Sequence, residues 1–295
     1  MHIFGFDFYL WLQNSKHKPP GEFDFLETQY DERVIGNVFK YHLIEIYTFI
    51  FGMCIGSFIN VCIYRLPESK SIIHPRSMCP KCGRQIKFYD NIPVLSYLWL
   101  KGKCRYCQTT ISWRYPLVEL LSGFFATFVY LKFGFGLAGL IYFAFISVLC
   151  IITFIDIDHQ IIPDIITLPC IPLCFLATFA LPTLTYKDSL IGLFSGGGSL
   201  FAVAWTYHMV TGKEGMGGGD IKLLAMIGTL LGWKGVFFTI FASSALGTVG
   251  GIIVMLLTQQ DRKLAVPFGP FLSIGAIVYV FFGSDLIDWY VHFLR

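Results

Sequence analysis

Long apolar blocks alternate with short polar breaks along most of this chain. Apolar runs that approach the roughly 20 residues of a bilayer-spanning helix begin near His42, Pro116, Gly136, Ile165, Ser189, Asp220, Gly235 and Ala265. The pattern predicts an all-α polytopic membrane protein with about eight transmembrane helices.

Composition supports a membrane protein rather than a soluble globular domain. The 295 residues are 55% hydrophobic and only 14% charged, and their mean hydropathy is +0.63, well to the apolar side of soluble domains. The first dozen residues lack a basic region and a small-residue cleavage pattern, so we expect no cleaved signal peptide. Membrane lipid is an expected partner, and nucleic acid is not.

The distribution of charge predicts the orientation of the spans. Residues 65–114 carry ten Lys and Arg against two acidic residues, Glu68 and Asp90, and the positive-inside rule places such a loop in the cytoplasm. Counting spans then puts both termini outside. The predicted divisions are a non-cytoplasmic N-terminal tail (1–41), a first transmembrane helix (42–66), a cytoplasmic loop (67–115) and a transmembrane core (116–295).

The loop between the first two helices contains two C-x-x-C pairs separated by 21 residues. They are Cys79 with Cys82 and Cys104 with Cys107. Four thiolates in two such pairs are the ligands that a tetrahedral Zn²⁺ site uses. Two disulfides or a redox pair are the alternatives, and a reducing cytoplasm argues against structural disulfides. We expect one structural zinc, which contributes most of the folding energy of so short a loop.

Ionisable residues at the edges of spans are candidate functional sites because they are costly in a membrane. Asp156 follows Gly136 by twenty residues, at the cytoplasmic edge of its span. The apolar run after Asp220, residues 221–233, would be about 20 Å long as a helix, too short for a core of roughly 30 Å. We therefore expect the glycines of 215–219 to be drawn into the membrane, where irregular backbone lies in protein or lines a watery cavity. The two aspartates would approach this cavity from the same side.

Two carboxylates that converge on one water are the arrangement of an aspartic protease, in which the pair shares a proton. A neighbouring strip of glycines would let a substrate backbone approach closely. The alternatives are a proton-coupled carrier and simple helix capping. Asp164, directly after Pro163, is typical of a helix N-terminus, and Asp158 is placed at the membrane interface.

Several motifs together resemble a known family, the type IV prepilin peptidases, which are bifunctional leader peptidases and N-methyltransferases of bacterial inner membranes. The motifs stand in family order: "GSFINVCIYRLP" (56–67), "CPKCG", "YDNIPVLSYLWLKGKCRYC" (89–107), "ISWRYPLVELLSG" (111–123), "IDIDHQIIPDIITLP" (155–169), "GMGGGDIKLLAMIG" (215–228) and "VPFGPFLSIGA" (266–276).

The resemblance implies catalytic aspartates at Asp156, seven residues before Pro163, and at Asp220 of the G-x-G-D motif. Asp158 is the less favoured assignment for the first. Supporting residues are Gly217, Gly219, Asp158 and Asp164. The implied substrates are prepilins or pseudopilins of pilus or type II secretion systems, whose basic leader is cut on the cytoplasmic side of the inner membrane. The new N-terminal residue is then methylated with S-adenosylmethionine.

Methylation rests on the cysteine loop, because family members without the loop resemble peptidases only. No soluble G-x-G nucleotide motif is present, so the residues that bind the methyl donor are not assigned. Candidates for a methyltransferase role are Gly102, Lys103 and Glu119, each of which could instead be a turn, topology or capping residue. Asn60 and Arg65 could hold the loop or the substrate. The alternative of a different class is a carrier or a non-catalytic scaffold of pilus assembly.

Overall fold

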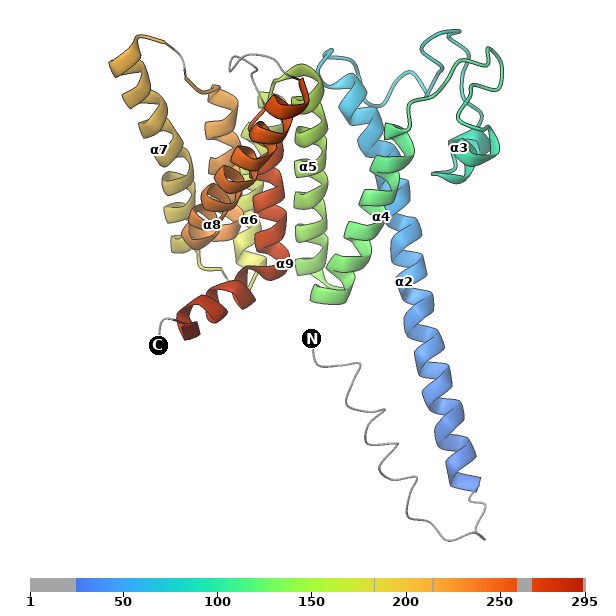
Figure 1. The fold of residues 1–295 in the computed structure, drawn as a ribbon. Coiled ribbons are helices and arrows are strands. Elements are labelled where there is room, and N and C mark those ends of the chain that lie inside the picture. Colours follow the sequence, from blue (N-terminus) through green and yellow to red (C-terminus); the bar gives the residue numbers. More distant parts are fainter. Residues whose placement is uncertain (1–24, 183, 214, 259–266, 294–295) are drawn as a thin grey trace. The chain divides into compact units, whose positions relative to one another are not determined.

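The protein, seen here as a computed structural model, is helical in its described residues, which are 25–182, 184–213, 215–258 and 267–293. It divides into two compact units, Met1–Ile46 and Tyr47–Arg295. The α-helices are α2 (Phe25–Arg65), α3 (Leu95–Trp99), α4 (Arg114–Phe133), α5 (Leu137–His159), α6 (Asp164–Ala177), α7 (Tyr186–Thr211), α8 (Gly218–Thr258) and α9 (Gly269–Phe293) (Figure 1). Two 3₁₀ turns, η1 (Phe88–Asn91) and η2 (Thr178–Ala180), complete the described elements.

The predicted all-α polytopic fold is confirmed. Five helices in the described residues are long and apolar enough to cross a membrane: His42–Arg65, Arg114–Phe133, Leu137–His159, Tyr186–Thr211 and Gly218–Ile253. Asp164–Ala180 and Gly269–Gly283 are shorter apolar helices. The predicted tail covers residues 1–41, and its last part is helical because α2 begins at Phe25. Residues 1–24 lie outside the described residues.

Helix α8 accounts for two of the predicted spans. Its apolar part has 36 residues, which would extend about 54 Å as a straight helix, against a membrane core of roughly 30 Å. Gly232 interrupts it with φ 70° and ψ 178°, a conformation that glycine adopts without a Cβ penalty. The two arms of α8 fold back on each other at this residue (Figure 1). Seven helical segments thus begin within a few residues of the predicted positions, and the apolar part of α2 begins at His42, as predicted for the first span.

Close backbone contact fixes the first arm of α8 against α7. A Cβ on Gly192 of α7 would lie 2.0 Å from the carbonyl oxygen of Gly228, and one on Gly196 would lie 2.4 Å from that of Leu224. The Ser189 hydroxyl also donates a hydrogen bond of 2.7 Å to the Thr229 carbonyl. Small residues of this kind let membrane helices approach and pack. This contact positions the helix that carries Asp220.

Most of the largest fully buried side chains of the core come from α5, α8 and α9. They include Leu149, Ile152 and Ile155 of α5, Leu223, Leu224, Met226 and Ile227 of α8, and Leu272 of α9. Asp156 directly follows this core in α5, and Asp220 directly precedes it in α8. Packing of apolar side chains therefore determines where the two carboxylates lie.

Polar contacts join the helix ends around these carboxylates. Arg114 at the start of α4 pairs with Asp158 at the end of α5. Lys222 in α8 pairs with Asp164 at the start of α6, with 2.7 Å between Nζ and Oδ1. These ends lie at one end of the helical bundle, as the predicted order of spans requires.

Candidate functional site

Asp156 is a buried carboxylate in the last turn of α5, only 5% exposed. Its Oδ2 accepts a hydrogen bond of 3.0 Å from the backbone N–H of Gly269, the first residue of α9. A Cβ on Gly269 would lie 2.6 Å from the same oxygen. The contact therefore requires glycine, and it places the carboxylate at the positive end of a helix, where a negative charge is stabilised.

Asp220 is half-buried in the first turn of α8. Its backbone N–H donates to the Gly217 carbonyl at 3.2 Å. Within the described residues, neither its carboxylate nor that of Asp156 forms an ion pair with a basic side chain. Among the described residues, both aspartates that the sequence singled out therefore lack a basic partner.

Ile162, in the turn after α5, lies between the two aspartate-bearing elements. A Cβ on Gly219 would lie 2.8 Å from its Cβ, and a Cβ on Gly269 would lie 3.2 Å from its Cδ1. Gly219 directly precedes Asp220, and Gly269 binds Asp156. The sequence analysis assigned no role to Ile162 or Gly269, although Gly269 lies in the quoted "VPFGPFLSIGA" motif.

Asp158 and Asp164 point to other partners. Asp158 is exposed and pairs with Arg114. Asp164 is exposed at the first position of α6, and both of its carboxylate oxygens accept hydrogen bonds of 2.7 Å from Lys222 Nζ. Lys222 follows Asp220 by two residues, so this ion pair ties α6 to the helix that carries Asp220.

The glycine strip is partly helical. Helix α8 begins at Gly218, so Gly218 and Gly219 extend the short apolar run as expected, whereas residues 215–217 are not helical. Gly217 and Gly218 are exposed, and a Cβ on Gly218 would meet nothing within 4 Å. An open backbone therefore lies beside Asp220.

The four loop cysteines form one cluster. The Sγ atoms of Cys79, Cys82, Cys104 and Cys107 all lie within 4.8 Å of one another, and none forms a disulfide. The Cys79 and Cys107 sulfurs are 3.7 Å apart. Zn–S bonds of about 2.3 Å in a tetrahedron place sulfurs about 3.8 Å apart, so the donor set and its spacing fit a tetrahedral metal ion.

The two cysteine pairs adopt the same turn twice. The N–H of Gly83 donates to the Cys79 carbonyl at 2.9 Å, and the N–H of Gln108 donates to the Cys104 carbonyl at 3.0 Å. Gly83 and Gln108 both have positive φ, at 66° and 57°. Isolated β-bridges close the turns, between Met78 and Gln85 and between Lys103 and Thr110. We call these two turns the first and second knuckle.

Hydrogen bonds around the second knuckle lower the pKa of two ionisable groups, Cys107 and Asp90. Those between Cys107 and the side chain and backbone of Thr109 lower the pKa of Cys107 to about 6, which favours the thiolate that binds metal. Arg105 donates to both oxygens of Asp90, at 2.8 Å from Nε and 2.5 Å from Nη2. This bidentate pair lowers the pKa of Asp90 and joins the second knuckle to η1.

The methyltransferase candidates lie where the loop is fixed in place. Gly102 has φ 66°, and a Cβ there would lie 2.9 Å from the Tyr97 hydroxyl oxygen. Lys103 is exposed at the base of the second knuckle. Glu119, buried in α4, accepts a hydrogen bond of 2.7 Å from the backbone N–H of Val94 in the loop.

Asn60 and Arg65 both hold backbone carbonyls near the ends of the loop. The Asn60 amide donates to the Tyr115 carbonyl at 3.0 Å. Arg65 donates to the carbonyls of Ser71 and Pro75 at 2.9 and 2.7 Å. These residues could hold either the loop or the substrate. The observed contacts are with the loop and with its junction to α4.

Comparison with known proteins covers most of the chain. Residues 50–133 match the bacterial peptidase A24 N-terminal domain, and residues 143–252 match the type IV leader peptidase family. The prepilin leader peptidase/N-methyltransferase of Aeromonas salmonicida is 37% identical over 268 residues, which cover 82% of this chain and 92% of the relative. That of Pseudomonas aeruginosa is 35% identical over 269 residues, covering 83% and 93%. No solved structure matches the chain significantly.

The two matched domains extend over both the cysteine loop and the helix ends that carry the two aspartates. By the two matched domains and the extent of the shared sequence, the chain belongs to the type IV leader peptidase family.

Proposed function

We propose that this protein cleaves the leader peptide of type IV prepilins or pseudopilins and then methylates the new N-terminal residue. The observation that carries the peptidase part is the position of Ile162, which lies against both Gly219, next to Asp220, and Gly269, which binds Asp156. Relatives with both activities in their names support the bifunctional assignment.

The surroundings of the two carboxylates support different roles. Both stand near helix N-termini, but in the described residues only Asp156 accepts a backbone N–H, that of Gly269. Because a hydrogen bond of this kind stabilises the ionised form, we assign the negative charge of the pair to Asp156 and the shared proton to Asp220. Like charges held close together do not both ionise cheaply.

The reaction that follows from this assignment is a general acid–base hydrolysis. Asp156 takes a proton from a water molecule, and the water oxygen attacks the scissile carbonyl carbon. At the same time Asp220 donates its proton to the carbonyl oxygen. When the C–N bond breaks, Asp156 returns its proton to the leaving amine and Asp220 recovers one from the gem-diol. Each carboxylate ends in its starting state.

Access for the substrate is provided by the exposed backbone of Gly217 and Gly218. An extended peptide can approach a backbone without side chains closely enough to reach Asp220. We place this end of the bundle on the cytoplasmic side of the bacterial inner membrane, since the basic loop lies at the same end and basic loops remain in the cytoplasm. A prepilin leader would emerge from the membrane there.

For the loop we propose one structural Zn²⁺, held by Cys79, Cys82, Cys104 and Cys107. The metal would link the two knuckles and contribute to folding of the loop. S-adenosylmethionine would supply the methyl group. Of the methyltransferase candidates, Gly102 and Glu119 support the loop backbone, and Lys103 has the exposed side chain. We therefore expect the first two to position the loop.

Co-expression with a prepilin tests both activities at once. Mass spectrometry of the substrate's N-terminus should show a shortened, methylated product with the wild-type protein and an intact leader with Asp156→Asn or Asp220→Asn. Asp158→Asn is the matched control, because Asp158 pairs with Arg114, and it should still process the substrate. A carrier or scaffold would leave the leader intact in every case.

A further inference from the structure

An apolar surface stands out within the polar cysteine loop. Besides Tyr89, five large apolar side chains of residues 88–99 are exposed: Phe88 (87%), Ile92 (45%), Leu95 (62%), Leu98 (64%) and Trp99 (85%). Contiguous exposed apolar groups of this size mark an interaction surface. We call these five side chains the apolar face of the loop.

The apolar face has a defined backbone, so it presents these groups together. Leu95, Leu98 and Trp99 are related by three and four residues within α3, the spacing that places side chains on one side of a helix. Tyr97 instead packs against Gly102, within 3 Å of where a Cβ would stand. The short helix therefore has one side toward the second knuckle and one side without a partner.

A hydrogen bond ties this segment to the beginning of a membrane-spanning helix. The Val94 N–H, directly before α3, donates to Glu119 Oε2 at 2.7 Å. Glu119 lies five residues into the membrane-spanning α4, about 7 Å along the helix axis, and the polar layer on each side of a bilayer is roughly 5 to 7 Å thick. Figure 1 shows α3 level with the first turns of α4.

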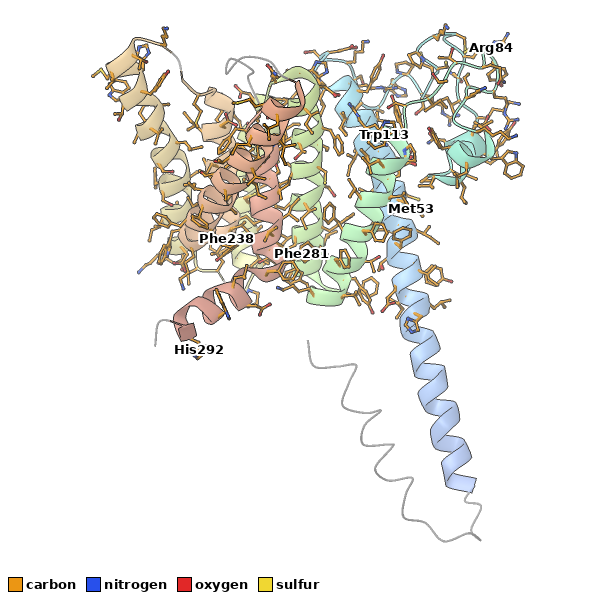
Figure 2. The ribbon with its side chains drawn as sticks, viewed as in Figure 1. Met53, Arg84, Trp113, Phe238, Phe281 and His292 are labelled. Carbon is orange, nitrogen blue, oxygen red and sulfur yellow. The ribbon has the colours of Figure 1, made fainter. Side chains whose placement is uncertain are left out.

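The first knuckle lies beyond the start of α4. In Figure 2, Arg84 of the first knuckle is farther from the membrane-spanning helices than Trp113, which directly precedes α4.

The backbone at Val94, which donates the hydrogen bond to Glu119, is strained. Val94 is β-branched and has φ 60°, a conformation that such residues rarely adopt. The segment is thus held at this level against a local preference.

The charges around the apolar face identify its partner. Lys87 and Lys101 flank it, and the only two acidic residues of the loop are already paired, Glu68 with Lys70 and Asp90 with Arg105. A basic surface repels basic peptides and attracts anionic headgroups, and Trp residues favour the membrane interface. We propose that the apolar face inserts into the headgroup–acyl boundary of a bilayer that contains anionic phospholipid.

Tryptophan quenching in proteoliposomes tests this placement. The full-length protein is reconstituted in phosphatidylcholine with brominated acyl chains, mixed with phosphatidylglycerol that carries no bromine. The emission of Trp99 is obtained as the difference between the wild type and Trp99→Phe. We expect the Trp99 emission to be lost to bromine to about the same extent as that of Trp205, an exposed residue of the membrane-spanning α7, obtained in the same way from Trp205→Phe. Quenching of Trp99 should weaken when phosphatidylglycerol is omitted.

Three outcomes would overturn the proposal. They are a Trp99 emission accessible to iodide and unaffected by bromine, quenching independent of the anionic lipid, and shielding of Trp99 that begins only when a prepilin is added. A second measurement keeps the test independent of fluorescence. Leu95→Ser with Leu98→Ser should speed hydrogen exchange of residues 88–100 in bilayers, while Ile73→Ser, at an exposed residue outside the face, should not.

Discussion

The cysteine cluster and the aspartate pair are assembled over very different distances in the sequence. The cysteines lie within residues 79–107, and each knuckle is closed by hydrogen bonds between residues four or five apart. Asp156 and Asp220 are 64 residues apart, and Asp156 receives its hydrogen bond from a residue 113 positions away. The first site depends on local turns and a metal, whereas the second depends on the packing of α5, α8 and α9. A change that disrupts one site should therefore leave the other site intact.

The largest expected effect is on the aspartates. Asp156→Asn or Asp220→Asn removes the general base or the general acid, which contributes about 10²- to 10⁴-fold in rate. Leader cleavage, measured as the rate of product formation in vitro, should fall by at least that range. Zinc content should stay at about one per chain. Loss of zinc in either variant would contradict the independence of the two sites.

The next effect separates positioning of the carboxylates from their chemistry. Gly269→Ala puts a methyl group 2.6 Å from Asp156 Oδ2, and Gly219→Ala puts one 2.8 Å from Ile162 Cβ. Because misplacement of about 1 Å costs on the order of 10²-fold in rate, we expect kcat to fall about that much in each variant. Binding of substrate, measured as KM, should change little.

Gly218→Ala is the control for these glycines, since its Cβ would meet nothing within 4 Å, although it lies in the same turn as Gly219. It should retain most of kcat, and because its methyl group would stand where the substrate approaches, any loss should appear in KM. Equal losses in Gly218→Ala and Gly219→Ala would show that the helix start tolerates no side chain at all, and the contact with Ile162 would lose its assigned role.

Removal of cysteines should affect only the loop. Cys79→Ser or Cys107→Ser should release about one zinc per chain, measured by elemental analysis of the purified protein, and should reduce methylation while leader cleavage continues. Cys54→Ser, at an exposed thiol of α2, is the control and should keep the zinc. A protein that holds no zinc in any form would refute the metal site, and loss of cleavage in the cysteine variants would refute the separation.

The same contrast explains which features were predictable from the sequence. The spans and the cysteine pairs are local patterns, so hydropathy and spacing were enough to find them. The burial of Asp156 rather than Asp158 also follows from local periodicity, because Asp156 continues the buried series of Ile152 and Ile155, while Asp158 lies about 200° around the helix. The contacts of Gly269 and Ile162 were not predictable, since they arise only when distant helices pack together.

The smallest expected effect concerns the ion pair between Asp90 and Arg105, which tests whether the loop also needs its local polar contacts. Arg105 lowers the pKa of Asp90, so the pair stabilises the loop above the ordinary pKa of aspartate, and this contribution is lost as pH falls through the lowered value. Asp90→Asn should therefore speed hydrogen exchange of residues 88–107 slightly at neutral pH, and the difference from the wild type should close in acid. Glu68→Gln, which removes the other acidic residue of the loop, should leave that segment unchanged. A difference for Asp90→Asn that persists in acid would mean that the carboxylate acts through packing rather than charge, because a protonated Asp90 and an asparagine carry the same charge.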